Sequence, residues 1–214
     1  MKESGNHRDV QISDVRMNIA VFLSGTGTNF KAIAAAIEEG KIPAKITLVA
    51  SNKPEAPGLM TAREMDFTTA LFRRDEYPDG ESFADYMLDT LNREEVQLIA
   101  LAGYLRKIPP KVLRRYKNRI INIHPALLPK YGGKGMYGMN VHKAVIASGD
   151  KETGVTIHYV NGEYDQGEII AQRKVPVLAG DTAESLAKRV LKVEHEFYPQ
   201  VIKELIERQK ENLR

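Results

Sequence analysis

Apolar runs of strand length alternate with helical segments along the first half of the chain, and this alternation most constrains the fold. Five runs have the composition of buried strands: 18–23, 45–50, 68–72, 96–102 and 119–123. Four segments between them have the composition of helices: 30–39, 55–65, 81–92 and 109–116. Strands that alternate with helices at this spacing predict a parallel sheet. We therefore expect an α/β fold: a single Rossmann-like domain whose mostly parallel, twisted sheet is flanked by helices.

The second half of the chain has a different pattern. Lys130–Gly138 is rich in glycine and has no period, which predicts a loop before a helix at 141–148. Two strands joined by a glycine-containing turn predict a C-terminal β-hairpin, at 155–160 and 168–175. A long final helix is expected at 182–208.

Composition supports one domain and excludes several classes of protein. The 214 residues are 43% hydrophobic, enough for a sizeable core. The chain has no cysteine, which fits a reducing compartment such as the cytoplasm. A net charge of +3 is too small to favour a nucleic-acid partner, and no apolar run approaches the ~18 residues of a membrane span. We expect residues 17–214 to form the domain and the polar residues 1–16 to be a disordered extension.

Two polar residues end the fifth predicted strand. Asn122 and His124 are two residues apart, so their side chains point to the same side, and Pro125 ends the strand. An amide donor and a titratable imidazole aimed at one point can stabilise an oxyanion. Taken alone, the two residues fit a capping asparagine and a surface histidine better. The loops that follow the neighbouring strands favour a functional site instead.

Three loops are expected to share one crevice. In the common doubly wound order, strand 1 lies beside strand 4 and strand 4 beside strand 5, and ligands bind beyond their carboxyl ends. Those ends carry SGTGTN at 24–29, AGYLRK at 102–107 and NIHPALLP at 122–129. Their convergence favours a binding site over chance placement.

The first of these loops predicts a phosphate site. Gly25-x-Gly27 resembles half of a dinucleotide fingerprint, but Phe30 stands where the third glycine would be. A nicotinamide cofactor is therefore disfavoured. A glycine turn that opens a helix suits a single phosphate. The alternative is an N-cap by Thr28 or Asn29, which is compatible with phosphate binding.

The remaining titratable residues carry weaker signals. Asp165 lies at the predicted hairpin tip, where an aspartate alone is most often a turn residue. His142 opens a helix and His158 lies inside a strand, so we interpret both as structural. The histidines are scattered without ligand spacing, so no metal site is indicated.

Together, SGTGTN, NIHPALLPKY and the D-x-G turn after HYV resemble the formyltransferase family that uses formyltetrahydrofolate, from Met17 to about Tyr198. The closest match is the member that acts in purine synthesis, and GGKGMYG is typical of one branch of that enzyme. The resemblance implies that 10-formyltetrahydrofolate, as cosubstrate, gives its formyl group to the amine of glycinamide ribonucleotide (GAR), without a metal. Methionyl-tRNA formyltransferases and formyltetrahydrofolate deformylases fit less well, because both carry a further domain and lack this pair of motifs.

The resemblance also assigns residues. Asn122, His124 and Asp165 match catalytic positions, at which Asn122 and protonated His124 would hold the oxyanion. Asp165 would favour charged His124 and help to remove the amine proton, through water. Residues matching the GAR site are Gly27, Thr28, Asn29 and Glu194. Residues matching the folate site are Leu105, Arg106, Lys107 and Ile108, with Asn122.

Some points stay open. Gly80 stands where the family often has an arginine that meets the folate glutamate tail, so either Arg73 or Arg74 compensates or tail affinity is weak. A deformylase, in which water replaces the amine, is an alternative function. A non-catalytic nucleotide-binding module is another, and it would not need Asn122, His124 and Asp165 together. The sequence leaves both a monomer and a homodimer open.

Overall fold

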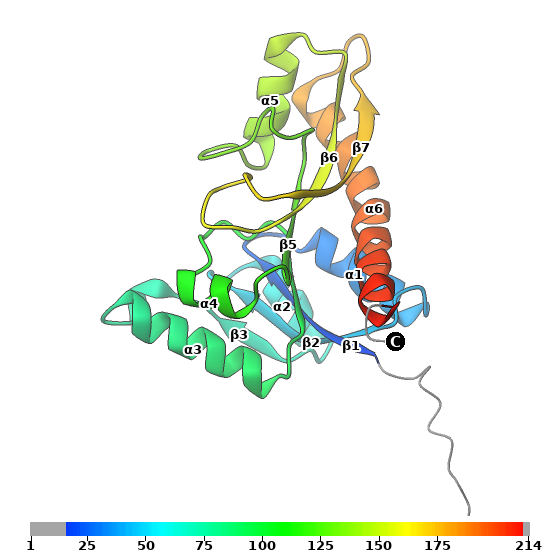
Figure 1. Ribbon diagram of the computed structural model, residues 1–214. Coiled ribbons are helices and arrows are strands. Elements are labelled where there is room, and N and C mark those ends of the chain that lie inside the picture. Colours follow the sequence, from blue (N-terminus) through cyan, green and yellow to red (C-terminus); the bar gives the residue numbers. More distant parts are fainter. Residues whose placement is uncertain (1–15, 212–214) are drawn as a thin grey trace, which may run out of the picture.

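The computed structural model describes residues 16–211 and contains one seven-stranded sheet (Figure 1). Its strand order is β3-β2-β1-β4-β5-β6-β7. The first five strands pair in parallel, and β6 is antiparallel to both β5 and β7. The strands are β1 Met17–Leu23, β2 Ala44–Ser51, β3 Thr69–Leu71, β4 Leu98–Leu101, β5 Ile120–His124, β6 Glu152–Tyr159 and β7 Ile169–Pro176.

This topology confirms the predicted α/β fold, the adjacency of strands 1, 4 and 5, and the C-terminal hairpin. The carboxyl ends of β1, β4 and β5 therefore meet at one edge of the sheet. The extension predicted at residues 1–16 falls outside the described residues except for Arg16. The boundary at residue 17 stays a prediction.

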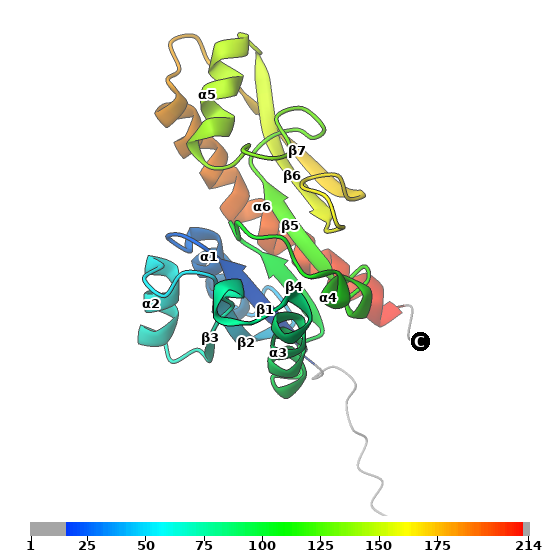
Figure 2. The same cartoon turned by 90° about the vertical axis from the view of Figure 1, so that its left-hand side faces the viewer.

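Helices cover both faces of the sheet (Figures 1 and 2). Residues of β1 alternate between two hydrophobic clusters: Val21 packs with the α1, α2 and α6 side, and Phe22 with the α3 and α4 side. This alternation is the period-two pattern of a strand buried on both faces. The helices are α1 Thr28–Glu38, α2 Pro57–Glu64, α3 Gly80–Arg93, α4 Pro110–Arg115, α5 Met139–Ser148 and α6 Ala183–Glu211.

Local chemistry explains where the helices start. Asp79 caps α3, because its Oδ1 accepts a hydrogen bond from the Ser82 N–H at 2.7 Å. Phe83, Met87 and Leu91 then recur every four residues and bury one face of the helix. A short 3₁₀ turn, η2 (Arg74–Glu76), was not predicted, because three residues carry no periodic signal.

A buried hydroxyl fastens α6 to the centre of the sheet. Tyr198 is fully buried, and its hydroxyl lies 3.0 Å from the Leu101 carbonyl of β4 and 3.3 Å from the Ile121 carbonyl of β5. These are the two strands whose ends carry the expected catalytic loops. The helix is therefore fixed directly to the scaffold of the site.

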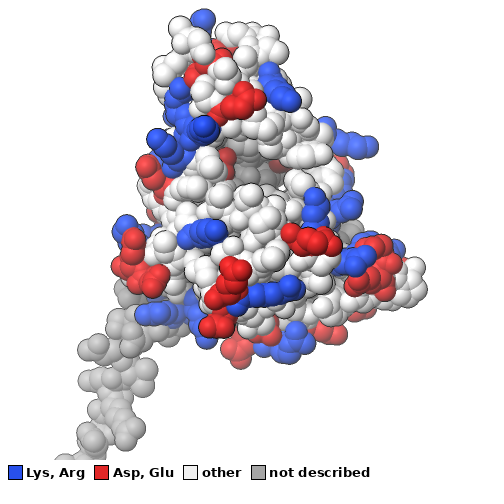
Figure 3. Space-filling model, turned by 180° about the vertical axis from the view of Figure 1, so that it is seen from behind, with Lys and Arg blue, Asp and Glu red and all other residues white. Residues whose placement is uncertain are grey.

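The surface carries mixed charge. On the face seen in Figure 3, lysine and arginine side chains are interspersed with aspartate and glutamate. Such a mixture is typical of an ordinary solvated surface. Among the described helices, none combines the length and the apolar character needed to cross a membrane.

Candidate active site

The end of β5 presents two of the predicted catalytic side chains beside β6. Asn122 pairs across the sheet with His158, and its Nδ2 lies 3.1 Å from the His158 Nε2. His124, the last residue of β5, is only 3% exposed. Its Nε2 lies 2.8 Å from the Tyr131 carbonyl oxygen. A carbonyl can only accept, so Nε2 carries the hydrogen and Nδ1 is the nitrogen that titrates.

Asp165 joins this pair from the loop between β6 and β7. Its backbone is left-handed, with φ of 56°. One carboxylate oxygen, Oδ2, accepts from the Gly133 N–H at 2.9 Å and lies 3.6 Å from the His124 Nδ1. The other oxygen lies 3.6 Å from the His158 Nε2. The structure thus brings Asn122, His124 and Asp165 together, as the sequence predicted.

Burial and charge act in opposite directions on these groups. Burial lowers the pKa of His124, and the nearby Asp165 carboxylate and the Tyr131 carbonyl only partly offset it. Burial would raise the pKa of Asp165, but the interactions with His158 and His124 and the hydrogen bond from the Gly133 N–H hold it below its usual value. In the unliganded protein at neutral pH, Asp165 is therefore charged and His124 is neutral.

His158 belongs to this cluster, although its place inside a strand suggested only a structural role. Its Nδ1 lies 2.8 Å from the Tyr159 carbonyl, so Nδ1 carries a hydrogen, and the Asn122 Nδ2 donates to Nε2. Asn122 uses one amide N–H for this acceptor and keeps a second one free. The missed signal is register: Asn122 and His158 are directly opposite each other across β5 and β6.

His142 also lies nearer the site than its sequence position suggested. It is 5% exposed, and burial, together with the proximity of His124, lowers its pKa. Its buried Nδ1 has no hydrogen-bond partner among the described residues.

The N-terminus of α1 is open, as a phosphate site requires. Gly27 is the N-cap, with φ of 71° and no side-chain capping bond. The alternative considered for this turn, an N-cap by Thr28 or Asn29, is wrong, because both are already the first residues of the helix. A Cβ on Gly27 would lie 2.7 Å from the Gly58 Cα, so only glycine permits this close approach of the loop to α2. The N–H groups of the first turn have no acceptor within the helix.

Asn29 and Glu194 meet across the gap between α1 and α6. The Asn29 Nδ2 donates to the Glu194 Oε2 at 2.6 Å, and each residue is 9% exposed. Burial raises the pKa of Glu194, while the hydrogen bond from Asn29 opposes that rise. The buried Asn29 Oδ1 has no hydrogen-bond partner among the described residues. Two residues assigned to GAR thus lie together at the opening of α1.

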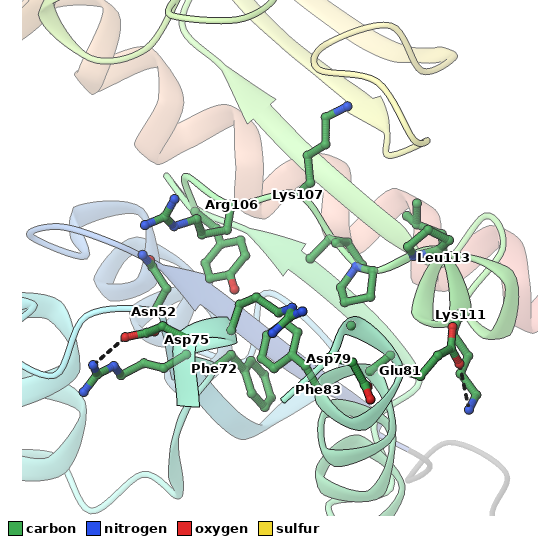
Figure 4. A pocket seen from close by; sticks show the side chains of 18 of the residues that line it. Asn52, Phe72, Asp75, Asp79, Glu81, Phe83, Arg106, Lys107, Lys111 and Leu113 are labelled. Atoms are coloured by element: carbon green, nitrogen blue, oxygen red, sulfur yellow. Dashed lines mark hydrogen bonds and ion pairs between the residues drawn. The ribbon is translucent and has the colours of Figure 1, made fainter. Parts of the chain in front are cut away.

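A cavity of about 1320 Å³ lies on the α3 and α4 side of the sheet (Figure 4). Arg106, Lys107 and Ile108 of the predicted folate segment line it. Its wall also includes Gly162 and Tyr164, which belong to the same β6–β7 loop as Asp165. The Lys107 Nζ reaches towards this loop and pairs with Glu163 at 3.1 Å. The cavity therefore extends to the loop that carries Asp165.

Leu105 differs from its neighbours in the predicted folate segment. It is 38% exposed and is not one of the residues that line the cavity. Its N–H instead donates to the Ser24 Oγ at 2.9 Å, which links the loops after β1 and β4. Its assignment to the folate site stays a prediction.

The cavity wall includes Gly80 and both arginines considered as substitutes for an arginine at that position, Arg73 and Arg74. A Cβ on Gly80 would lie 3.9 Å from the Arg74 Nε, so the Arg74 side chain passes beside this position. Arg73 is held by Asp75 and Glu76, each at 2.8 Å. Arg74 donates only to the Tyr77 carbonyl, at 2.9 Å, among its described contacts. Arg74 is therefore the better placed cation for an anionic ligand.

Within residues 16–211, no group of three or more histidine, aspartate or glutamate side chains is arranged to hold a metal ion.

Comparison with known proteins identifies the family. Residues 17–202 match the family model described as formyl transferase. The chain belongs to the formyl transferase family. It is 48% identical to the chloroplastic phosphoribosylglycinamide formyltransferase of Vigna unguiculata, over 92% of this chain but 63% of that protein. The chain thus spans less than two thirds of that plant relative.

Bacterial members of the formyl transferase family match over nearly their whole length. The phosphoribosylglycinamide formyltransferase of Haemophilus influenzae is 42% identical, over 91% of both chains. The crystal structure of glycinamide ribonucleotide transformylase 1 from Geobacillus kaustophilus has a TM-score of 0.82 and 39% identity. The match covers 89% of this chain and 99% of that one.

Proposed function

We propose that the protein transfers the formyl group of 10-formyltetrahydrofolate to the amine of GAR. The observation that carries this proposal is the Asn122–His124–Asp165 cluster around the buried His124 ring. It lies at the same sheet edge as the open end of α1, and the loop that carries Asp165 also borders the large cavity. The open helix end suits the phosphate of GAR. The cavity suits the folate. The relatives' names support the same pair of substrates.

Each residue of the cluster has a chemical task. As the GAR nitrogen bonds to the formyl carbon, the carbonyl electron pair moves to oxygen, and the free N–H of Asn122 donates to this oxyanion. The amine proton passes to the Nδ1 of His124, through water, and the charged ring stabilises the oxyanion. When the oxyanion collapses, the folate nitrogen leaves and takes up this proton. Asp165, 3.6 Å away, stabilises charged His124 between the two transfers.

The lowered pKa of His124 fits this sequence of events. A neutral ring is required to take up the amine proton, whereas the family resemblance alone implied a protonated ring. Because the charge exists only while the oxyanion exists, the interaction is stronger in the transition state than in the ground state. This difference is what accelerates a reaction.

The GAR half of the site would be held by α1 and α6. The phosphate would accept from the first N–H groups after Gly27, including those of Thr28 and Asn29. Glu194 would accept from a ribose hydroxyl beside Asn29, to which it is already bonded. Anchoring both reactants makes the transfer effectively intramolecular, an advantage of about 7 kcal/mol or more that a water molecule could not share.

For the folate half, we propose that Arg74 binds the glutamate tail, because Arg73 is neutralised by two carboxylates. Arg106, Lys107 and Ile108 would line the pterin side. The absence of cysteine favours the cytoplasm as the compartment.

Release of tetrahydrofolate, followed by absorbance, tests the proposed function. We expect slow release from 10-formyltetrahydrofolate alone and a sharp rise when GAR is added. Dephosphorylated GAR should restore little of that rise, because it lacks the anchor at α1. Comparable release in all three reactions would favour a deformylase. Binding of GAR without turnover of any formyl folate would favour a non-catalytic module.

A further inference from the structure

Tyr131 connects the catalytic cluster to a second group of polar side chains outside it. Its main-chain carbonyl lies 2.8 Å from the His124 Nε2. Its hydroxyl lies 2.6 Å from the Asp150 Oδ2, in the segment between α5 and β6. The backbone of Tyr131 is left-handed, with φ of 58°, which is unfavourable for a bulky residue. Such a conformation persists only where the surroundings hold it.

The two residues after Tyr131 contact the other member of the catalytic pair. The Gly133 N–H donates to the Asp165 Oδ2 at 2.9 Å. A Cβ on Gly132 would lie 2.6 Å from the Leu128 Cδ2 and 3.2 Å from the Asp165 Cβ, so the main chain is tightly packed here. A segment of three residues thus touches both His124 and Asp165 through its main chain. Any shift of this segment would change both contacts at once.

The Asp150 carboxylate is a firm anchor for the Tyr131 hydroxyl. A carboxylate can only accept, so the phenol proton lies on this bond. The Lys130 Nζ donates to the same oxygen at 2.5 Å, and hydrogen bonds from Lys130 and Tyr131 lower the pKa of Asp150. The Ser148 Oγ lies 2.5 Å from the Tyr131 hydroxyl. Asp150 itself follows Gly149, the C-cap of α5, so the anchor is built on a helix end.

We propose that the hydrogen bond between Tyr131 and Asp150 is a positioning device for His124. It holds the Tyr131 carbonyl where that carbonyl fixes the Nε2–H tautomer and leaves Nδ1 facing Asp165. Without it, the left-handed Tyr131 relaxes, the carbonyl turns away, and the ring can carry its hydrogen on either nitrogen. The kinetic consequence rests on the proposed function, but the tautomer does not.

Two variants remove this bond from opposite sides. Tyr131→Phe keeps the ring and loses the hydroxyl, whereas Asp150→Ala loses the acceptor. Asp150→Asn keeps an acceptor oxygen and is the conservative rescue. Lys130→Met is the matched control, because it removes the exposed ion pair to the same carboxylate and leaves the Tyr131 bond. Circular dichroism and thermal melts establish the folded fraction of each variant.

We expect Tyr131→Phe and Asp150→Ala each to lower kcat about tenfold, with the KM of both substrates changed less than about twofold. The apparent pKa in the kcat/KM profile should move downward, because the Tyr131 carbonyl favours the charged ring of His124. His158, His142 and Asp165 also face this ring, and none is altered in these variants. Asp150→Asn and Lys130→Met should stay near the parent protein.

Nitrogen-15 NMR of labelled histidine reads the tautomer without any substrate. At a pH where His124 is neutral, the parent protein should show hydrogen on Nε2 alone, and Tyr131→Phe should show both tautomers. An unchanged tautomer and pH profile in Tyr131→Phe would overturn the proposal, even if activity fell. Should that variant fail to fold, Asp150→Ala gives the same test. Absence of formyl transfer in the parent protein would refute the proposed function and leave the NMR test standing.

Discussion

Replacing Asp165 by asparagine removes one charge and little volume. The carboxylate lies 3.6 Å from the His124 Nδ1, and the imidazole is 3% exposed. At an effective dielectric constant of about 20, two unit charges at this distance interact by about 4 to 5 kcal/mol. That energy is available only while His124 is charged, between the two proton transfers. Since about 1.4 kcal/mol corresponds to a factor of ten, we expect Asp165→Asn to lower kcat on the order of a thousandfold.

The asparagine is chosen because its amide oxygen can still accept from the Gly133 N–H, so the loop should keep its place. Single-turnover measurement of formyl transfer, with both substrates saturating, isolates the chemical step. Glu152→Gln is the matched control, because it removes an exposed carboxylate paired only with Lys174 at 2.8 Å. Adding His124→Ala to Asp165→Asn should cost little more than the worse single change. Losses that multiply, or an Asp165→Asn protein with more than a tenth of normal kcat, would refute this reasoning.

Three further predictions follow from the flanking contacts. Glu194→Gln should raise the KM of GAR roughly tenfold and leave that of the folate unchanged, because it weakens a buried acceptor on the GAR side only. Arg74→Ala should weaken binding of a polyglutamylated folate, measured by calorimetry, and equal weakening by Arg73→Ala would contradict the assignment. Folding stability, measured by urea unfolding, should fall as pH drops below about 6.5. Burial lowers the pKa of both His124 and His142, so the unfolded chain binds more protons in that range. Each group contributes a slope of up to about 1.4 kcal/mol per pH unit, and His142→Gln should remove one such contribution.

The sheet and two of the three expected catalytic residues could be predicted because they follow from local pattern. Alternating apolar runs predicted a parallel sheet, and the common doubly wound order placed the ends of β1, β4 and β5 together, as they are in the structure. Asn122 and His124 could be placed on one side of a strand from their spacing alone. Asp165 needed the family resemblance, since an aspartate in a turn carries no signal of its own. In the structure His124 lies beside Asp165, and His158 links Asn122 to Asp165.

The remaining features depend on distances that a linear pattern does not contain. His158 faces Asn122 only because of the antiparallel register of β5 and β6, which the loop between them does not reveal. An N-cap by Asn29 was a reasonable alternative at α1, because asparagine is favoured at that position. In the structure the Asn29 side chain instead donates to Glu194, 165 positions away in the sequence. Tertiary contacts of this kind override local preference.

Helix α6 holds the GAR side of the proposed site more rigidly than the folate side is held. Glu194 and Tyr198 lie one turn apart on this helix. The expected ribose contact at Glu194 and the Tyr198 hydroxyl that donates to β4 and β5 therefore belong to one rigid helix. The side that would receive the folate is lined by α3 and α4 and also by loop residues, among them Arg106, Gly162 and Tyr164. Mutations in those loops can change which folates are accepted without moving the acceptor amine. Directed evolution of cosubstrate preference should therefore find its gains in the loops, and substitutions at Tyr198 should disturb both halves together.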